Sequence, residues 1–445
     1  MPKITHRKKR LSSFKLIVLG FAGVIVLGAL ILMLPFSSTS GVVTPFHEAL
    51  FTSTSAVCVT GLVVQDTGSY WSAFGQTVIL LLIQIGGLGV VTVAALFAML
   101  SGRKISLMQR STMQDAISAP KVGGIVRLTR FIVRGTFLIE LIGMIVMLPT
   151  FCGNYGIKGI WMAAFHSVSA FCNAGFDILG TAENKYPSLT GYIGNPAINI
   201  TIMLLIIVGG IGFLTWDDIY TNKWHFKKYR MQSKVILVTT AILIIAPAVF
   251  FFFCDFTGLP LAERILASLF QSVTPRTAGF NTADLPAMTG SSKAIMTLLM
   301  LVGGSPGSTA GGMKTTTLAV LILSAFSVCR KKNDAEVCGR RIDGSAVKNA
   351  AAVAVMYFLL FFVGGIVIST AEGLPLSTCL YETASAVGTV GLTLGITPQL
   401  GVLSQLILIV LMYLGRVGGL TLIYAAISNK NQSGAKLPLE KITVV

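Results

Sequence analysis

Residues 385–394 of the chain read S-A-V-G-T-V-G-L-T-L, and the second glycine in this stretch, Gly391, has three counterparts elsewhere. Aligned on that glycine, the four segments are V-C-V-T-G-L at 57–62, F-C-N-A-G-F at 171–176, P-R-T-A-G-F at 275–280 and V-G-T-V-G-L at 387–392. Their aligned glycines lie 114, 104 and 112 residues apart. Four similar segments at a nearly constant spacing indicate an internal repeat.

The composition around these segments is that of an integral membrane protein. Of 445 residues, 53% are hydrophobic and 11% are charged, and the mean hydropathy is +0.79, whereas soluble domains carry about 25% charged residues. The net charge of +17 does not indicate a nucleic-acid partner, because most basic residues lie in short loops between apolar stretches. The seven cysteines are scattered without metal-ligand spacing, so neither a metal site nor a disulfide framework is expected.

Each glycine segment lies in the same order of apolar stretches. A stretch long enough to cross the membrane, which needs about 20 residues, precedes a shorter one that ends at the glycine segment, and a second long stretch returns. The long stretches are predicted at 14–36, 71–100, 130–150, 196–216, 235–253, 294–328, 350–370 and 402–427, and the short ones at 45–57, 159–171, 261–274 and 376–387. This order predicts an all-α membrane protein with four parallel span–pore helix–span repeats. Its eight transmembrane helices and four re-entrant loops would have pseudo-fourfold symmetry around a central pore.

The distribution of charge sets the predicted orientation and divisions. Only Lys158, Lys185, Arg264, Arg276 and Lys293 of the 34 basic residues fall in predicted outer segments, so both termini are expected in the cytoplasm. The predicted divisions are a cytoplasmic N-terminus at 1–13, repeat 1 at 14–110, repeat 2 at 111–222, repeat 3 at 223–335, repeat 4 at 336–428 and a cytoplasmic tail at 429–445. The long loops at 101–130 and 326–348 are expected to dock a partner or anionic membrane lipid.

The glycine segments have the chemistry of a cation filter. Thr389-Val390-Gly391 matches the T-V-G core of a potassium selectivity filter, in which backbone carbonyl oxygens replace the water shell of the ion. The preceding short helices would point their partially negative C-terminal ends at the pore axis, which favours cations. The alternative is that the glycines only let re-entrant loops pack closely. The predicted ion-binding residues are Val59, Thr60, Gly61, Asn173, Ala174, Gly175, Thr277, Ala278, Gly279, Thr389, Val390 and Gly391.

The returning stretches contain glycine clusters at 86–89, 209–212, 303–304 and 415–419. For the first, second and fourth clusters we expect close helix packing. From 303 to 317, however, glycine, proline and polar residues continue in a run that cannot form a straight helix. This run is expected to cross the pore below the filter and to gate it. The predicted gate residues are Gly303, Gly304, Ser305, Pro306, Gly307, Ser308, Thr309, Ala310, Gly311, Gly312, Lys314 and Arg416.

Several charged residues have open roles. Arg416 would either slow cations in the pore or anchor the loop through its carbonyls, and Lys314 would act in the gate or snorkel to the inner boundary. Arg276 has Glu263 and Asp284 as candidate partners. The carboxylates near the pore helices and filters are candidates for attracting cations at the outer mouth, with solvated loop residues as the alternative; they are Glu48, Asp177, Asp284 and Glu382.

These repeats, with one glycine per loop and a broken third returning stretch, resemble the Trk, Ktr and HKT superfamily of potassium transporters over nearly the whole chain. The compact length is most similar to the membrane subunit of the bacterial Ktr branch. The resemblance implies that Gly61, Gly175, Gly279 and Gly391 are filter glycines, that 303–317 is the intramembrane gating loop, and that Arg416 is the basic residue below the filter. It also implies a homodimer in the bacterial plasma membrane, a cytosolic RCK-type ring of regulatory subunits that bind ATP and ADP, and uptake that is often stimulated by sodium.

The leading hypothesis is therefore a channel-like potassium uptake transporter without a cofactor of its own. ATP and ADP are expected only on a separate regulatory subunit, because no glycine-rich dinucleotide motif follows a strand in this chain. One alternative is a less selective transporter of sodium and potassium. Another is an ion-coupled secondary symporter, for which Glu140 is the main intramembrane carboxylate. A membrane enzyme is not expected, because no nucleophile–base pair or metal cluster occurs at membrane depth.

Overall fold

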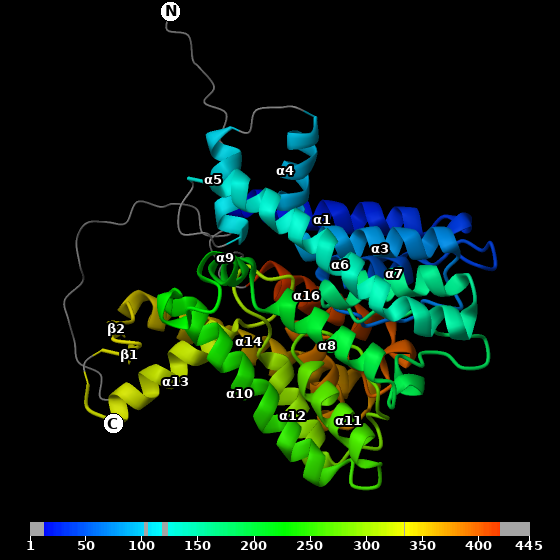
Figure 1. Ribbon diagram of the computed structural model, residues 1–445. Helices are drawn as coiled ribbons and strands as arrows, with labels where there is room; N and C mark the ends of the chain where they lie inside the picture. Colours follow the sequence, from blue (N-terminus) through cyan, green and yellow to red (C-terminus); the bar gives the residue numbers. More distant parts are fainter. Residues whose placement is uncertain (1–12, 102–105, 118–122, 333, 419–445) are drawn as a thin grey trace, which may run out of the picture.

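The computed structural model describes residues 13–101, 106–117, 123–332 and 334–418. Their secondary structure is almost entirely helical (Figure 1). Residues 1–12 of the expected N-terminal segment, residue 419 of the last glycine cluster and the expected tail at 429–445 lie outside the described residues.

Four of the described helices are long and apolar enough to cross a membrane. They are α1 (Ser13–Leu32), α6 (Ile125–Tyr155), α10 (Met231–Cys254) and α14 (Gly344–Glu372). Two bent helix pairs raise the number of candidate spans to six if each pair is counted as one span. These pairs are α3 (Ala73–Leu88) with α4 (Val90–Leu100), and α8 (Pro196–Gly210) with α9 (Phe213–Asn222).

Short helices occupy the four predicted pore-helix segments. They are α2 (Phe46–Cys58), α7 (Lys158–Phe171), α11 (Leu261–Val273) and α15 (Leu376–Gly388), and each packs mainly against the long helix before it. Three of the four begin immediately after a proline, namely Pro45, Pro260 and Pro375. Proline lacks a backbone N–H and disfavours helical conformation in the residue before it, so it fixes where a helix can begin.

The helices that follow the glycine segments are α3, α8, α12 (Gly290–Leu301) and α16 (Val402–Val417). Capping side chains fix where they start. Oγ of Ser72 accepts a hydrogen bond from the backbone N–H of Gly75 (3.2 Å), and Oδ1 of Asn195 accepts one from that of Ile198 (3.1 Å). In the fourth unit, Glu372 at the end of α14 accepts a hydrogen bond from the backbone N–H of Gly401 (2.9 Å), which ties the start of α16 to the preceding long helix.

Sharp bends, which the sequence did not predict, break the spans expected at 71–100 and 196–216. Helix α3 ends at Gly89 and α8 ends before Gly212, where the backbone has φ of 85° and 91°. The following helices α4 and α9 turn by 96° and 98° from their predecessors. Gly418, with φ of 85°, ends α16 in the same way. Glycine adopts positive φ without a Cβ clash, so these clusters terminate helices as well as pack them.

The remaining elements lie between the long helices. They are α5 (Leu107–Ile117), α13 (Thr315–Cys329), the short 3₁₀ turns η1 (Pro35–Ser37), η2 (Thr190–Tyr192), η3 (Phe226–Lys228) and η4 (Thr397–Gln399), and the strands β1 (Glu336–Val337) and β2 (Arg340–Arg341). The two strands pair antiparallel. The structure thus departs from the expected all-α fold by one small hairpin. In Figure 1, α4 and α5 lie at the top and α13 and this hairpin lie on the left, away from α7 and α11.

Candidate functional site

The four glycine segments share an unusual backbone. The residue two positions before each aligned glycine has a positive φ, at 58° for Val59, 60° for Asn173, 68° for Thr277 and 53° for Thr389. This conformation is rare for a branched side chain and costs about 1–3 kcal/mol, so it persists only where the surroundings enforce it. The glycines themselves have φ of 95°, 66°, 81° and 93° in chain order. The four segments are therefore structurally equivalent.

The four glycines close a ring. A Cβ atom on Gly61 would overlap the carbonyl oxygen of Ala174, one on Gly175 that of Ala278, one on Gly279 that of Val390, and one on Gly391 that of Thr60. Each segment thus touches the next in chain order, and the fourth returns to the first. Because any side chain at these positions would collide with a neighbouring carbonyl, only glycine fits.

The amide groups of these segments point back to their own short helices. The backbone N–H groups of Thr60, Ala174 and Val390 each donate to a carbonyl oxygen five residues earlier, at 2.8 Å. The N–H groups of Gly61 and Gly391 donate to the hydroxyls of Ser55 and Ser385, both at 3.0 Å. With the donors engaged behind the loops, the acceptors are left for another partner. A ring of backbone carbonyl oxygens is the arrangement that replaces the water shell of a monovalent cation.

Threonine hydroxyls add further oxygens. Within the described part of the chain, the buried Oγ1 atoms of Thr60, Thr277 and Thr389 have no hydrogen-bond partner. A buried hydroxyl without a partner is costly, and a dehydrated cation would satisfy its lone pairs. All twelve residues predicted to bind the ion lie in the four glycine segments, and their binding of an ion stays a prediction.

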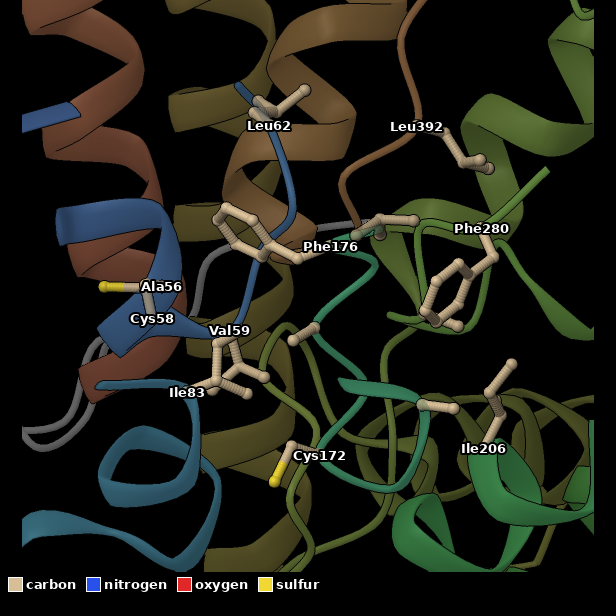
Figure 2. Packing of buried hydrophobic residues seen from close by; sticks show 14 of the residues in the cluster. Ala56, Cys58, Val59, Leu62, Ile83, Cys172, Phe176, Ile206, Phe280 and Leu392 are labelled. Atoms are coloured by element: carbon tan, nitrogen blue, oxygen red, sulfur yellow. The ribbon is translucent and has the colours of Figure 1, made fainter. Parts of the chain in front are cut away.

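Large apolar side chains fix the segments from behind. Figure 2 shows Leu62, Phe176, Phe280 and Leu392, each directly after an aligned glycine, gathered from four separate parts of the chain. All four are buried. At the ends of three of the four short helices, Gly86, Gly209 and Gly415 press against the carbonyl oxygens of the residues four positions before the aligned glycines. The close packing expected of these three clusters is thus present together with the helix ends they form.

The predicted gate run forms a loop between α12 and α13, closed at its base. The backbone N–H of Gly303 donates to the carbonyl of Met313 (2.8 Å), and that of Thr315 donates to the carbonyl of Gly304 (3.0 Å). The loop lies against the ring. A Cβ on Gly311 would overlap the Thr389 hydroxyl. The Thr309 hydroxyl donates to the carbonyl of Phe171 at 3.1 Å.

Two basic side chains bind this loop. The Arg416 guanidinium donates through Nη1 to the carbonyl of Thr309, and through Nη2 to those of Gly86 (2.5 Å) and Gly87 (3.3 Å). Of the two roles considered for Arg416, the contacts favour the anchor. Nζ of Lys314 donates to the carbonyl oxygens of Ala310 (2.9 Å) and Gly311 (3.4 Å), so it binds the loop rather than snorkelling away from it. Both side chains line a cavity of about 200 Å³ beside α5.

The candidate pairing of Arg276 with Glu263 or Asp284 is wrong. Among the described residues Arg276 makes no ion pair. Its side chain is buried and points to α10, where Nη2 donates to the hydroxyl of Thr240 (3.4 Å), whereas Asp284 is exposed.

Glu382 has a role that the sequence did not indicate. Its carboxylate is buried in α15 and accepts hydrogen bonds from the Thr393 hydroxyl (2.5 Å), the Leu394 backbone N–H (3.0 Å) and the Thr397 hydroxyl (2.8 Å). It therefore holds the chain that leaves the fourth glycine segment. Glu48 in α2 accepts a hydrogen bond from Gln65 (2.9 Å). The sequence signal that was missed is a carboxylate in a helix followed by four threonines within 15 residues, of which Thr393 and Thr397 bind it.

Glu382→Gln should relax the fourth segment. An amide cannot replace three charge-assisted hydrogen bonds, each worth about 1.5–3 kcal/mol. We expect the ratio of rubidium to sodium influx into proteoliposomes to fall about tenfold, with Glu48→Gln as the matched control. Unchanged selectivity in Glu382→Gln would contradict a role for Glu382 in shaping this segment.

Asp177 lies two residues after the second aligned glycine and is half-buried. Burial, together with the nearby Asp66 carboxylate, raises the pKa of its carboxyl to about 7. The carboxylate is therefore charged above pH 7 and neutral below it, so its attraction for cations weakens as the outer solution becomes acidic.

We expect the apparent affinity for rubidium to fall about fivefold between outer pH 8 and 6, a loss of about 1 kcal/mol. Asp177→Asn should abolish this dependence and Glu183→Gln, in an exposed loop, should keep it; a pH profile retained in Asp177→Asn would assign the titration to another group.

Glu140 is the one intramembrane carboxylate of α6. Nε2 of Gln84 donates to its Oε2 (3.4 Å), and the Cys172 thiol, next to Asn173, donates to Oε1 of the same Gln84 (3.6 Å). This network lies behind the ring, between the first and second units.

Comparisons with known proteins match this chain over most of its length. A family model described as TrkH, cation transport protein, matches residues 13–434. The potassium/sodium uptake protein NtpJ of Enterococcus hirae is 39% identical, with 98% of each chain covered. Ktr system potassium uptake protein B of Bacillus subtilis is 37% identical, with 95% of each chain covered. The crystal structure of the potassium transporter TrkH from Vibrio parahaemolyticus has a similar fold, with a TM-score of 0.74 at 19% identity over 96% of this chain and 87% of that one.

Proposed function

The chain belongs to the TrkH family of cation transport proteins, and from that membership we propose that it is the ion-conducting membrane subunit of a potassium uptake system. The observation that carries the mechanism is the ring of four glycine segments, each touching the next through a backbone carbonyl. In the proposed mechanism, carbonyl oxygens and threonine hydroxyls of the ring replace the water around potassium.

The proposed architecture is four parallel span–pore helix–span units around the ring. In support, each short helix packs against its own long helix and ends at a glycine segment with the same backbone conformation. Non-helical backbone at membrane depth is tolerated where it is buried or lines water. Counting each broken returning helix as one span then gives eight spans, with the pore axis through the ring.

The proposed gate is the loop between α12 and α13. Its contact with Thr389 and the bonds from Arg416 and Lys314 to its carbonyls support a position across the inner side of the ring. While the loop stays there it would block the exit of cations, and movement away from Arg416 would open the path. Arg416 is thus proposed to hold the gate loop in this closed position.

The proposed setting is a bacterial plasma membrane with both termini in the cytoplasm. The basic segments that end the long helices support this orientation. The relatives named as Ktr system proteins support a membrane subunit that works with other components. The resemblance also leads us to propose that the chain forms a homodimer and binds a cytosolic RCK-type ring. In this proposal the ring binds ATP and ADP, and this chain has no cofactor.

The test is cation flux with the purified full-length chain in liposomes. Rubidium influx that potassium inhibits and that sodium inhibits at least tenfold less well would support a potassium-selective pore. Influx that both ions inhibit equally would favour the second candidate, a potassium and sodium transporter, which the name of the Enterococcus relative also favours. Flux that requires an imposed sodium or proton gradient would favour a symporter and direct attention to Glu140.

A further inference from the structure

One face of α6 changes from apolar to basic along its length. Its exposed positions recur at helical spacing, and the upper ones are apolar: Phe137, Leu138, Leu141, Ile142 and Ile145 are each more than half exposed. Such a face is the part of a spanning helix that meets lipid. Toward the start of α6 the same face carries arginines, and all three are exposed; they are Arg127, Arg130 and Arg134.

These arginines carry uncompensated charge. In residues 13–101, 106–117, 123–332 and 334–418, none of the three forms an ion pair. The acid beside them, Asp217 of α9, is bound by Arg230 at 3.0 Å. Asp218 accepts bonds from the backbone N–H of Arg230 (3.0 Å) and the hydroxyl of Ser233 (2.6 Å). The positive face of α6 therefore remains available for an anion.

A groove opens beside this face. It has a volume of about 690 Å³ and lies between the start of α6 and helix α9. Its lining mixes apolar and aromatic side chains with Arg127, Arg230 and Asp217, while Arg130 and Arg134 lie outside that lining. The ring of Phe131 lies 5.4 Å from that of Tyr220.

Exposed aromatic side chains continue from the groove. Tyr220 is 73% exposed, and Trp224, which follows α9, is 99% exposed. Aromatic residues of this kind concentrate where a protein meets the boundary between membrane and water. Tyr220 and Phe131 line the groove together with Arg127, which indicates that the groove lies at headgroup level.

We propose that this groove and the three arginines of α6 bind the headgroup of an anionic phospholipid, whose acyl chains lie along the apolar face above. The proposal rests on the orientation given under the proposed function, which puts this end of α6 at the inner leaflet. Guanidinium groups bind phosphate through several hydrogen bonds at once. A basic cluster directly below a spanning helix attracts anionic lipid. The apolar continuation of the same face favours a lipid over a soluble acidic partner, because acyl chains would cover these apolar side chains and a soluble acidic partner would not.

Native mass spectrometry of the full chain in detergent tests this directly. The protein is incubated with equal amounts of phosphatidylglycerol and phosphatidylcholine, and the retained lipid is counted. The test variant carries Arg127→Gln, Arg130→Gln and Arg134→Gln together. The preference for phosphatidylglycerol should fall about 100-fold, since each basic residue near an anionic surface contributes about a fivefold effect.

Two further variants make the result specific. Arg330→Gln, Lys331→Gln and Arg340→Gln together remove the same charge from exposed positions around the end of α13 and the hairpin, and should leave the preference intact. A variant with Arg127→Lys, Arg130→Lys and Arg134→Lys keeps the charge and should retain most of the preference for phosphatidylglycerol. Equal lipid preference in the glutamine variant and the wild type would overturn the proposal and leave the face to a protein partner. Rubidium flux measured separately reports on the proposed function, because lipid retention does not depend on ion selectivity.

Discussion

Replacing Gly279 with serine should reduce rubidium influx at least tenfold and lower its preference over sodium. Gly279 has φ of 81°, which costs a residue with a Cβ about 1–2 kcal/mol. The new Cβ would also overlap the carbonyl oxygen of Val390 and approach the Cα atoms of Gly175 and Gly391, both at 3.2 Å. The third segment, and with it the ring, must therefore deform, and a loss of about 1.4 kcal/mol in ion stabilisation is already a tenfold effect.

The measurement is influx of rubidium and sodium into liposomes with equal amounts of folded protein. Gly290→Ser serves as the control, because a Cβ at Gly290, in the first turn of α12, would meet no atom within 4 Å. If Gly279→Ser carried both ions as the wild type does, the third segment would be a packing element and the pore would have to be placed elsewhere.

Replacing Arg416 with glutamine should raise rubidium influx about tenfold. The guanidinium joins the gate loop, at Thr309, to the end of α3, at Gly86 and Gly87. Hydrogen bonds from a charged group are worth about 1.5–3 kcal/mol each, so their loss should favour loop positions away from the ring. The substitution also removes a positive charge beside the proposed cation path.

Arg264→Gln is the matched control. Arg264 also donates to a backbone carbonyl, that of Phe252, through Nε (2.8 Å) and Nη2 (2.6 Å), but it lies in α11 and not at the gate loop. The initial rate of rubidium influx under a fixed potassium gradient, divided by the amount of reconstituted folded protein, separates the rate from the amount of active protein. Lower influx in Arg416→Gln would mean that the guanidinium keeps the pore in shape rather than latching the loop.

The short helices and the glycine segments could be predicted from the sequence because their signals are local. Helix α2 begins one residue after the start expected at 45 and ends one residue after the end expected at 57, since a proline and a glycine segment delimit it. The nearly constant spacing of the four similar segments indicated that their aligned glycines are equivalent. Which segment touches which, and through which oxygen, could not be predicted, because it depends on contacts between residues more than 100 positions apart.

The bends of the returning helices were missed for a different reason. A glycine pair in a membrane helix is compatible with a straight, closely packed helix, and nothing local distinguishes that case from a helix end. A signal existed in the spacing, however. Gly86, Gly209 and Gly415 press on the short helices, and a glycine of positive φ follows each after three residues, at Gly89, Gly212 and Gly418. The interior partner of Arg276 was missed likewise, because Thr240 lies on another helix.

The ring is built from four different sequences in one polypeptide, with its contacting oxygens supplied by Thr60, Ala174, Ala278 and Val390. In a pore assembled from four identical subunits, one codon change would alter all four walls at once. Here a single mutation alters one quarter of the circle and leaves three quarters untouched. If the ring is the proposed filter, natural selection can therefore adjust ion preference in small genetic steps, one segment at a time.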